Sequence, residues 1–460
     1  ANVNDWDDSS SDGSVDDDVE KMQVKFTTKI ADKKYEAPHS AYYVPITLTR
    51  YGISEVLNNL LQLEEPQAFD ILIDDKFLRT SLQRYVKAKN LSHEDVVLDL
   101  EYVLALEAPK EKAECEHEDW ISCLDTAGTS AMSTYCCSGG YDGTVRFWTR
   151  LNDADPFDFS CSLVLSAHAK PIKDVSLFKA EKRKCELLTA SQDFTIKWWS
   201  IRKIHKEAGQ SLMAARKDSL LGEFSGHKSA VESVTISPSA DRFISGAFDG
   251  TMLAWELNEF DPNQQEDIAL ESGDEPNTKK QKIEPKRKPL LKMGEHTGCV
   301  SSLHWKEESL CWSSAWDHSI RSWDLPTGIC TKKMYCGTSI YSISCAKESP
   351  LILSGHADRT IRLWDPRSTG HMITQQFKSH KAWVPSVQWH PTKTQIFSSA
   401  SHDGTVKIWD MRSEFALHSI PSHDTKALCV AWHDDETILS GGADTKLKIH
   451  QFNNPLSQSQ

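Results

Sequence analysis

The stretch SGGYDGTVRFW, residues 138–148, decides the fold because six further stretches of the chain repeat its pattern. In every copy a serine or threonine stands four residues before an aspartate, and a tryptophan or histidine stands six residues after it. The seven aspartates are Asp142, Asp193, Asp249, Asp317, Asp358, Asp403 and Asp444. Recurrence of this kind indicates a repeat architecture in which each copy is one structural unit.

A histidine precedes most of these aspartates, at His117, His168, His227, His296, His380 and His423. The copy that ends at Trp364 lacks this histidine and has Cys336-Gly337 in the corresponding region. Each unit reads as short alternating strands with turn residues between them. A four-stranded unit of this size cannot bury its faces alone, so the units are expected to stack around an axis.

The repeated pattern resembles the WD-repeat family, in which His, Ser or Thr, Asp and Trp form a buried hydrogen-bonded tetrad. By that resemblance His296, Ser313, Asp317 and Trp323 are structural residues. The sequence therefore predicts a mainly β fold, with a seven-bladed propeller over residues 106–453.

The repeated His, Ser and Asp also look like a hydrolase triad, but a reaction needs one nucleophile whereas every blade needs a strut. The sequence has no phosphate-binding GxxxxGKS loop, no HExxH and no GxSxG. We therefore predict that the protein is not an enzyme.

Residues 21–105 predict a second, smaller domain that precedes the propeller. A strand-like MQVKFTTK and a second extended stretch are followed by ISEVLNNLLQL, whose apolar residues have helical spacing. A third strand, AFDILID, leads through a turn at Asp74-Asp75 into KFLR, and VVLDLEYV closes the module. The order ββαββ resembles the ubiquitin-like β-grasp (α+β) fold. No diglycine follows the last strand, so we expect a docking head rather than a conjugated modifier.

Three segments have the composition of disordered chain. Residues 1–20 hold eight acidic residues and no basic ones, residues 454–460 form a short tail, and residues 256–290 form an insertion between blades 3 and 4. The insertion ends in a basic cluster, which is typical of a nuclear-import signal or of a patch that binds RNA phosphate, and import is the favoured interpretation. The cluster comprises Lys279, Lys280, Lys282, Lys286, Arg287 and Lys288.

The formal net charge of −14 argues against a protein that coats nucleic acid over its whole surface, and leaves direct RNA contact open. No apolar run approaches the roughly 18 residues that a membrane span needs, so no membrane span is expected.

The pairing of a ubiquitin-like head with seven WD repeats narrows the resemblance. Together with YGISEVLNNLL, FLRTSL, LSHEDVV and HEDWIS, it is similar to the WD-repeat subunits of the Pescadillo complex (PeBoW-type), which matures the large ribosomal subunit. The similarity runs from about residue 22 to residue 453. It implies a non-catalytic assembly factor of the pre-60S particle in the nucleolus and nucleoplasm. The implied partners are Pescadillo, the block-of-proliferation protein and the AAA ATPase Midasin.

In that family a carboxylate of the head completes the coordination of Mg²⁺ in the metal-ion-dependent adhesion site of Midasin, and ATP-driven pulling then releases the complex. Mg²⁺ is a hard cation that accepts carboxylate oxygen. The family's acidic residue lies in the loop before the last strand, where this sequence has Glu94, with Asp95 as its rival. The resemblance thus implies no intrinsic metal or cofactor, and a Mg²⁺ ion shared with the partner ATPase through Glu94.

In WD-repeat propellers the residue before each repeated aspartate lies on the same rim as the tetrad histidines. The residue before the first strand of each blade lies nearby. Aromatic residues at these positions are candidate partner contacts, because aromatic residues are enriched in binding hot spots. They are Trp120, Tyr141, Phe248, Trp316 and Trp383. Whether this rim or a blade edge receives the partner's propeller stays open.

Other functions also stay open. A substrate receptor of a cullin-type ubiquitin ligase would use WDxR motifs such as Trp364-Asp365-Pro366-Arg367 and Trp409-Asp410-Met411-Arg412. A histone-tail or peptide reader would place acidic residues around the central channel. A metal-dependent hydrolase is a weaker alternative, because the sequence has no ligand cluster outside the repeats.

Overall fold

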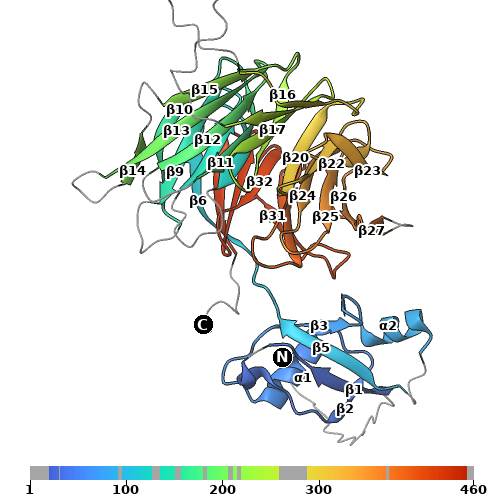
Figure 1. Cartoon of the computed structure of the whole chain (residues 1–460). Coiled ribbons are helices and arrows are strands. Elements are labelled where there is room, and N and C mark those ends of the chain that lie inside the picture. The colour runs from blue at the N-terminus through green and yellow to red at the C-terminus, as the bar shows by residue number, and fades with distance from the viewer. Residues whose placement is uncertain are drawn as a thin grey trace, which may run out of the picture. The chain divides into compact units, whose positions relative to one another are not determined.

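The computed structural model divides the chain into two compact units, with the boundary between Leu106 and Glu107 (Figure 1). It describes residues 20–30, 32–91, 96–126, 135–150, 157–179, 184–205, 211–214, 219–257, 287–368 and 372–452. The predicted acidic tail, the C-terminal tail and nearly all of the predicted insertion lie outside these residues. No helix of the described residues is long and apolar enough to cross a membrane.

The first unit, which we call the head, is a five-stranded sheet with two α-helices. Its order along the sheet is β2-β1-β5-β3-β4, and β1 and β5 are parallel at its centre. This is the β-grasp arrangement that the sequence predicts. The elements are β1 (Lys21–Thr27), a 3₁₀ turn (Lys33–Tyr35), β2 (Ala41–Pro45), α1 (Arg50–Leu61), β3 (Phe69–Ile73), β4 (Lys76–Phe77), α2 (Leu82–Lys89) and β5 (Leu98–Leu104).

The core of the head lies between α1 and one face of the sheet, as the helical spacing predicts. Ile53 and Leu57 of α1 are fully buried, and they belong to one apolar cluster with Phe26 of β1 and Tyr102 of β5. The turn between β3 and β4 has positive φ at both Asp74 and Asp75, the backbone of a tight two-residue hairpin.

Helix α2 is absent from the predicted order ββαββ, which is therefore incomplete. The segment has apolar residues at helical spacing, and its buried Leu82 and Val86 join the core of the head. The hydroxyl of Ser81 accepts a hydrogen bond from the backbone N–H of Arg84, so it caps the helix. The helix is only eight residues long and is rich in charged residues. Its pattern of apolar residues is therefore weaker than the patterns of the neighbouring strands.

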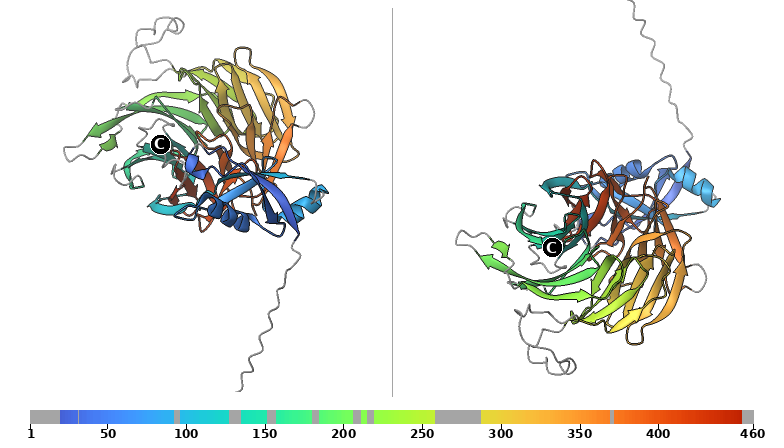
Figure 2. Two further views of the ribbon diagram at one scale, coloured as in Figure 1. Left: turned by 90° about the horizontal axis from the view of Figure 1, so that it is seen from below. Right: turned by 90° about the horizontal axis from the view of Figure 1, so that it is seen from above.

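The second unit is the propeller, in which the described residues form seven antiparallel sheets (Figures 1 and 2). Blade 1 consists of β7 (Ile121–Thr126), β8 (Tyr135–Gly140), β9 (Thr144–Arg150) and β10 (Phe159–Ser166). Blade 2 consists of β11 (Ile172–Phe178), β12 (Lys184–Ser191), β13 (Thr195–His205), β14 (Ser211–Ala214) and β15 (Leu220–Ser225). Blade 3 consists of β16 (Val231–Ile236), β17 (Arg242–Ala247), β18 (Met252–Glu256) and β19 (Leu291–Met293).

The remaining blades follow the same four-stranded plan. Blade 4 consists of β20 (Val300–Glu307), β21 (Leu310–Ala315), β22 (Ser319–Asp324) and β23 (Ile329–Tyr335). Blade 5 consists of β24 (Ile340–Cys345), β25 (Ile352–His356), β26 (Thr360–Trp364) and β27 (Ile373–Lys378). Blade 6 consists of β28 (Ser386–Trp389), β29 (Ile396–Ala400), β30 (Thr405–Asp410) and β31 (His418–Pro421). Blade 7 consists of β32 (Ala427–Trp432), β33 (Thr437–Gly442), β34 (Lys446–Gln451) and β6 (Lys110–Glu116).

Strand β6 closes the ring because the first strand of this unit completes its last blade. It pairs antiparallel with β34, from Lys446 opposite Glu116 to Gln451 opposite Lys110. In Figure 1 the cyan strand β6 lies beside the red strands of blade 7. The ends of the propeller are thus joined by hydrogen bonds rather than by covalent linkage.

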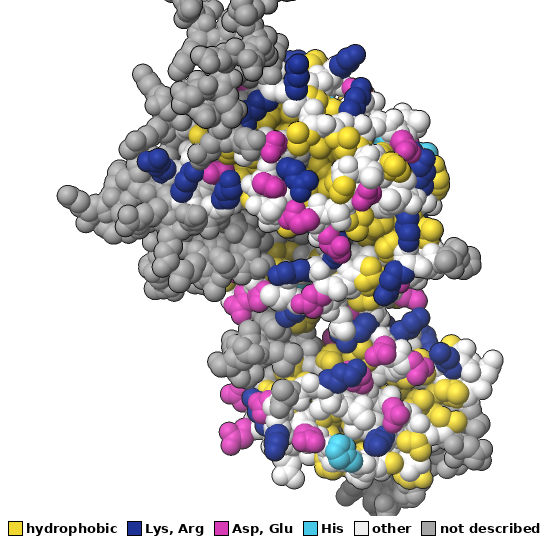
Figure 3. Space-filling view, viewed as in Figure 1, with side chains coloured by type: hydrophobic (Ala, Val, Ile, Leu, Met, Phe, Trp, Pro, Cys, Tyr) yellow, Lys and Arg dark blue, Asp and Glu magenta, His cyan; other side chains and the backbone are white. Residues whose placement is uncertain are grey.

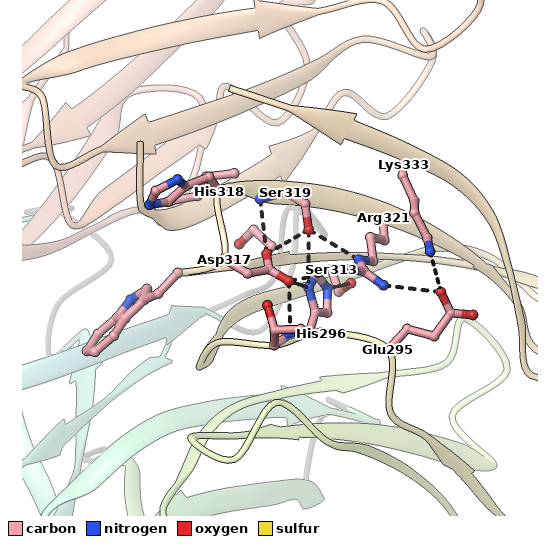
Figure 4. A network of polar contacts seen from close by, with 12 residues as sticks. Glu295, His296, Ser313, Asp317, His318, Ser319, Arg321 and Lys333 are labelled. Atoms are coloured by element: carbon pink, nitrogen blue, oxygen red, sulfur yellow. Dashed lines mark hydrogen bonds and ion pairs between the residues drawn. The ribbon is translucent and has the colours of Figure 1, made fainter. Parts of the chain in front are cut away.

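The predicted tetrad is present in blade 4, and Figure 4 shows its His296, Ser313 and Asp317. The His296 ring bonds through Nδ1 to Asp317 at 2.8 Å and through Nε2 to Ser313 at 2.7 Å, and the Trp323 indole N–H donates to Ser313 at 2.7 Å. Burial lowers the pKa of His296. Burial alone would raise the pKa of Asp317, but hydrogen bonds from His296 and Ser319 hold it well below its usual range. The set is a buried strut, as the sequence predicts.

Blade 5 supplies its histidine from an unexpected strand. His356 lies in β25, two residues after Ser354, and its Nε2 is 2.7 Å from the Ser354 hydroxyl, to which the Trp364 indole N–H also donates. On the other side of the ring, Nδ1 is 3.2 Å from the Thr338 hydroxyl. The repeat pattern correctly shows that the usual histidine is missing, but it does not reveal this replacement.

Blade 7 has histidine where the other blades have tryptophan. His450 Nε2 is 2.8 Å from the Ser422 hydroxyl, and that hydroxyl is 2.8 Å from Ser440, the serine that His423 also contacts. Ser422 thus links His450 to Ser440, because the imidazole ring is smaller than the indole ring of the other blades.

Neighbouring blades are linked by side chains of the inner strands that accept hydrogen bonds from the next blade. Asp125 of β7 accepts from the N–H of Leu177 at 2.7 Å, and Asp174 of β11 accepts from the N–H of Val234 at 2.9 Å. Burial raises the pKa of Asp125 to about 6 and the pKa of Asp174 to about 7. Serine hydroxyls farther round the ring likewise accept from backbone N–H groups of the next blade: Ser302 from Ile343, Ser342 from Val387 and Ser386 from Val430.

His356→Phe should destabilise the propeller by about 1–3 kcal/mol, because it removes a buried hydrogen-bond partner of Ser354 and Thr338. Thermal unfolding of the full chain measures the effect. His318→Asn is the matched control, because His318 is exposed and asparagine tolerates its positive φ. Equal melting temperatures for the two variants would contradict the assigned role of His356.

Asp174→Asn should gain stability relative to wild type as the pH rises. The folded pKa of about 7 lies above the unfolded value near 3.9, so the folded protein holds the proton more tightly and the free energy of unfolding falls between these pH values. Asparagine stays neutral and can still accept from Val234. The variant-minus-wild-type difference should grow by about 3 kcal/mol between pH 5 and pH 8 in denaturant titrations. A difference that does not change with pH would refute this assignment.

Candidate functional site

One rim of the propeller carries both sets of residues that the sequence predicts as partner contacts. In every blade the N–H of the residue before the repeated aspartate donates, at 2.8–3.1 Å, to a carbonyl that precedes the first strand, directly in six blades and by three residues in blade 6. The donor and acceptor pairs are Tyr141 and Trp120, Gln192 and Pro171, Phe248 and Ala230, Trp316 and Cys299, Ala357 and Ser339, His402 and Trp383, and Ala443 and Lys426. The two sets are therefore neighbours in space.

The tetrad histidines begin on the same rim. The N–H of His168 donates to the carbonyl of Gly143, in the aspartate turn of the preceding blade, and the N–H of His423 donates likewise to Gly404. At both glycines φ is positive, and an added Cβ would lie 2.3–2.6 Å from the histidine carbonyl. The buried tetrads thus hold the loops that form the rim.

The aromatic residues of this rim form a continuous arc over blades 3 to 6. Consecutive rings are 5.5–6.0 Å apart, and the Tyr341 and Trp383 rings are stacked. The rings of the arc are Phe248, Trp316, Tyr341, Trp383 and His402. Phe248, Trp316 and Trp383 are 49%, 39% and 49% exposed, which is unusual for such large apolar side chains.

A second group of aromatics lies on blades 1 and 2. Trp120 is 43% exposed and packs edge-on against Tyr141, with the ring centroids 5.5 Å apart. Phe194, in the aspartate turn of blade 2, is also exposed and has the ammonium of Lys170 above its ring. We call this group and the arc together the aromatic rim.

Five residues of the aromatic rim are among the contacts that the sequence predicts, whereas Tyr341, Phe194 and His402 are not. Tyr341 is the second residue of β24, and the equivalent second positions of β11 and β16 hold Lys173 and Glu232. An alignment of the seven repeats at that position would have revealed it. Phe194 occupies a turn position where three of the other copies have glycine and three have His318, Arg359 and Thr445, so only comparison of the turns would have singled it out.

Lys173 and Glu232, which follow two of the rim positions in blades 2 and 3, form an ion pair. The Lys173 ammonium is 3.8 Å from the Glu232 carboxylate and 5.1 Å from the centre of the Tyr141 ring. Burial would lower the pKa of Lys173, but Glu232 and Tyr141 together raise it. Burial raises the pKa of Glu232. This pairing gives no support to a reader of basic peptides, which would need unpaired acids at the channel.

The proposed metal-docking residues of the head, Glu94 and Asp95, lie outside the described residues. The residues on either side line a groove of about 610 Å³ between β5, β3 and the end of α2. Its lining includes Leu72, Val97 and Asp74, which accepts a hydrogen bond from the Tyr85 hydroxyl at 3.0 Å. Burial raises the pKa of Tyr85 to about 12, so this donor keeps its proton at physiological pH.

The import candidates are only partly described. Lys279, Lys280, Lys282 and Lys286 lie outside the described residues. Lys288 is exposed, whereas the guanidinium of Arg287 lies 5.5 Å from the Trp198 ring and 5.1 Å from the Phe224 ring. Arg287 is therefore packed against blade 2 rather than presented freely.

The two WDxR motifs bind their own arginines. Arg367 donates to both oxygens of Asp365 at 2.9–3.0 Å, and Arg412 donates to both oxygens of Asp410 at 2.8–2.9 Å. The side chain of Arg412 is mostly covered, and Arg367 is exposed. Among the described residues, no group of three or more His, Cys, Asp or Glu side chains is placed to hold a metal ion.

Comparison with protein families recovers both units. The NLE (NUC135) domain model matches residues 22–86, and the WD domain, G-beta repeat model matches residues 110–149, 159–200, 218–256, 328–365, 372–410 and 415–451. The six repeat matches leave out β20, β21 and β22 of blade 4, whose tetrad is nevertheless complete in the structure.

Several proteins are similar to this chain over nearly its whole length. A ribosome biogenesis protein WDR12 homolog from Oryza sativa subsp. japonica is 33% identical over 95% of this chain and 98% of the relative. The Nematostella vectensis WDR12 homolog is 32% identical over 94% of this chain and 100% of the relative. The ribosome biogenesis protein YTM1 of Kluyveromyces lactis is 31% identical over 96% of this chain and 99% of the relative.

Proposed function

Because the chain belongs to the family of ribosome biogenesis proteins that includes the WDR12 homologs and YTM1, we propose that it is a non-catalytic scaffold of the pre-60S particle. Its propeller and its head bind different partners within a Pescadillo-type complex. The observation that carries the proposal is the aromatic rim, a large exposed apolar surface held by buried struts. Such a surface is typical of a protein interface.

The partner of the propeller is the propeller of the block-of-proliferation protein, and the aromatic rim is the contact surface. Three features support this choice of surface: the continuity of the aromatic side chains, their exposure, and the pairing of Lys173 with Glu232. Aromatic anchors at the centre of an interface each contribute about 2 kcal/mol or more to binding.

The partner of the head is the metal-ion-dependent adhesion site of Midasin, with Glu94 as the ligand that completes the Mg²⁺ shell. The metal belongs to the partner, and this chain supplies the carboxylate. The NLE domain match over residues 22–86 supports a family role for the head, and the groove beside the loop, which charged and apolar residues line together, supports a docking role for this side of it. ATP-driven pulling through this contact would release the complex from the pre-ribosome.

The family implies a nuclear or nucleolar location, and we place the protein in the nucleolus and nucleoplasm. Import would be directed by the basic cluster Lys279 to Lys288. Since Arg287 is packed on Trp198 and Phe224, an import receptor would read the lysines of this cluster.

A cullin-type substrate receptor is the rival function. The arginines of both WDxR motifs are engaged by the aspartates of the same motifs, so these motifs add no exposed feature that favours the rival. Trp-Asp at the end of a blade strand is also common among WD repeats, which makes the match unspecific.

The double variant Trp316→Ala, Trp383→Ala should weaken binding to the partner propeller about 30-fold or more, because two exposed anchors are removed. Titration calorimetry with the purified partner measures this, and the melting temperature should stay near that of the wild type. Phe415→Ala is the matched control, since Phe415 is an exposed aromatic in the loop between β30 and β31. Equal effects of the control and the double variant would count against the aromatic rim.

Glu94→Ala should abolish Mg²⁺-dependent binding of the full chain to the adhesion-site domain of Midasin, while thermal unfolding is unchanged. Asp95→Ala is the neighbouring control and should retain binding. Surface plasmon resonance with Mg²⁺ and with EDTA separates the metal-dependent part of the affinity. Loss of binding in Asp95→Ala with retention in Glu94→Ala would transfer the role to Asp95, and full binding by both would eliminate the proposed contact.

A further inference from the structure

Three separate segments of this acidic chain are rich in lysine and arginine. Residues 179–186 contain four lysines and arginines and two acids, residues 202–218 contain five and two, and residues 279–288 contain six and one. Together these segments hold 15 (4, 5 and 6) of the chain's 52 lysines and arginines but only five of its 66 acids. A chain with a net charge of −14 thus concentrates positive charge in a small part of its sequence.

The fold brings the described parts of all three segments to one side of blade 2. Lys184 of β12 lies directly opposite Arg202 of β13 in the antiparallel ladder. The Lys179 ammonium is 5.9 Å from the Trp198 ring, and the Arg287 guanidinium is 5.5 Å from the same ring. Lys179 and Arg287, which are about a hundred residues apart in the chain, therefore both pack on Trp198.

The acid beneath this surface positions the lysines above it. Glu186 is buried, and its carboxylate binds Lys184 at 2.8 Å and Lys179 at 3.4 Å and accepts a hydrogen bond from the Trp198 indole at 3.1 Å. Both lysine side chains remain about 40% exposed. One covered carboxylate thus holds two ammonium groups at the surface, with an excess of positive charge.

The outer members of the cluster face solvent. Arg202 and Lys288 are both exposed, and neither has an ion pair among the described residues. Arg202 lies four residues along β13 from Trp198, about 13 Å at the usual rise of a strand. Figure 3 shows dark-blue side chains on the upper left of the view, the side on which Figure 1 draws β13 and β15. We call Lys179, Lys184, Arg202, Arg287 and Lys288 the blade 2 basic surface.

Lysines and arginines spaced along a surface can each bind one phosphate of a nucleic-acid backbone. Each phosphate that they neutralise increases the affinity, and the increase becomes smaller as the salt concentration rises. The rings of Trp198 and Phe224 are covered by Arg287 and are nearly fully buried, so no base can stack on them. The surface therefore offers contacts to the backbone without contacts that read bases. In a ribosome biogenesis factor the available polyanion of this chemistry is RNA.

We propose that the blade 2 basic surface binds the phosphate backbone of RNA without sequence preference. Lys184, Arg202 and Lys288 contact phosphates, and Arg287 positions its segment by stacking on Trp198 and Phe224. This binding is separate from the aromatic rim and from the head, so it does not depend on the partners proposed for them.

The test is the double variant Arg202→Glu, Lys288→Glu in the full chain. Both side chains are exposed, so the fold should persist, and thermal unfolding checks this. Fluorescence anisotropy with a labelled 20-nucleotide RNA measures the dissociation constant from 50 to 200 mM salt. The variant should bind at least tenfold more weakly at low salt, and its slope of log K against log salt should be smaller by about 1–2. Lys347→Glu, Lys378→Glu reverses two exposed charges in blade 5 and should bind as the wild type does.

Two results would overturn the proposal. One is RNA binding by the double variant with the affinity and salt slope of the wild type, or an equal loss in the blade 5 control. The other is binding of a poly-glutamate peptide, lost in the double variant, without measurable binding of RNA, which would identify an acidic protein segment as the ligand.

Discussion

The propeller depends on a buried hydroxyl that two rings share. In blades 2, 4 and 6 a serine or threonine of the second strand receives the indole N–H of the third strand and contacts the histidine of the incoming loop. The hydroxyls are nearly inaccessible to water, so an unmade bond would cost about 1–3 kcal/mol. One hydroxyl therefore fixes a strand, a turn and a loop together. The aromatic rim consists of those turns and loops, which explains how exposed side chains keep a defined arrangement without burial of their own.

Other residues can make the hydrogen bonds to the buried hydroxyl when their rings lie in the same place. In blade 5 the ring of His356 reaches Ser354 from the same strand, and in blade 7 Ser422 links the smaller ring of His450 to Ser440. In both blades a hydrogen-bonded ring still fills the site. Each blade therefore requires a hydrogen-bond partner for the buried hydroxyl of its second strand. Which residue serves as this partner depends on which backbone segment passes close enough to place a ring there.

Closure by β6 makes the propeller one cooperative body and gives it distinct surfaces. The strand joins blade 7 to the segment that follows the head, so the ring is complete only when residues 110–116 are in place. Inner-strand carboxylates and serines then tie each blade to the next. On this rigid frame the apolar aromatic rim and the blade 2 basic surface involve different residues, and two partners of different chemistry could bind without competition for the same side chains. The proposed function adds a third contact, the carboxylate of Glu94 in the head.

The sequence by itself determined the seven repeats, the recurring tetrad residues, the β-grasp head and the positions of five rim residues. These follow from local chemistry, because hydroxyl, aspartate and indole recur at fixed separations along strands and turns whose geometry is the same in every blade. The short helix α2 was not predicted, because eight residues give little periodicity.

Only the tertiary structure decided the long-range relations. It showed that His356 replaces a missing ring, and that Lys184, Arg202 and Arg287 share one side of blade 2. Each of these depends on distances between residues that are far apart in the chain. Such distances are set by how blades pack around an axis, and no local pattern in the sequence encodes them.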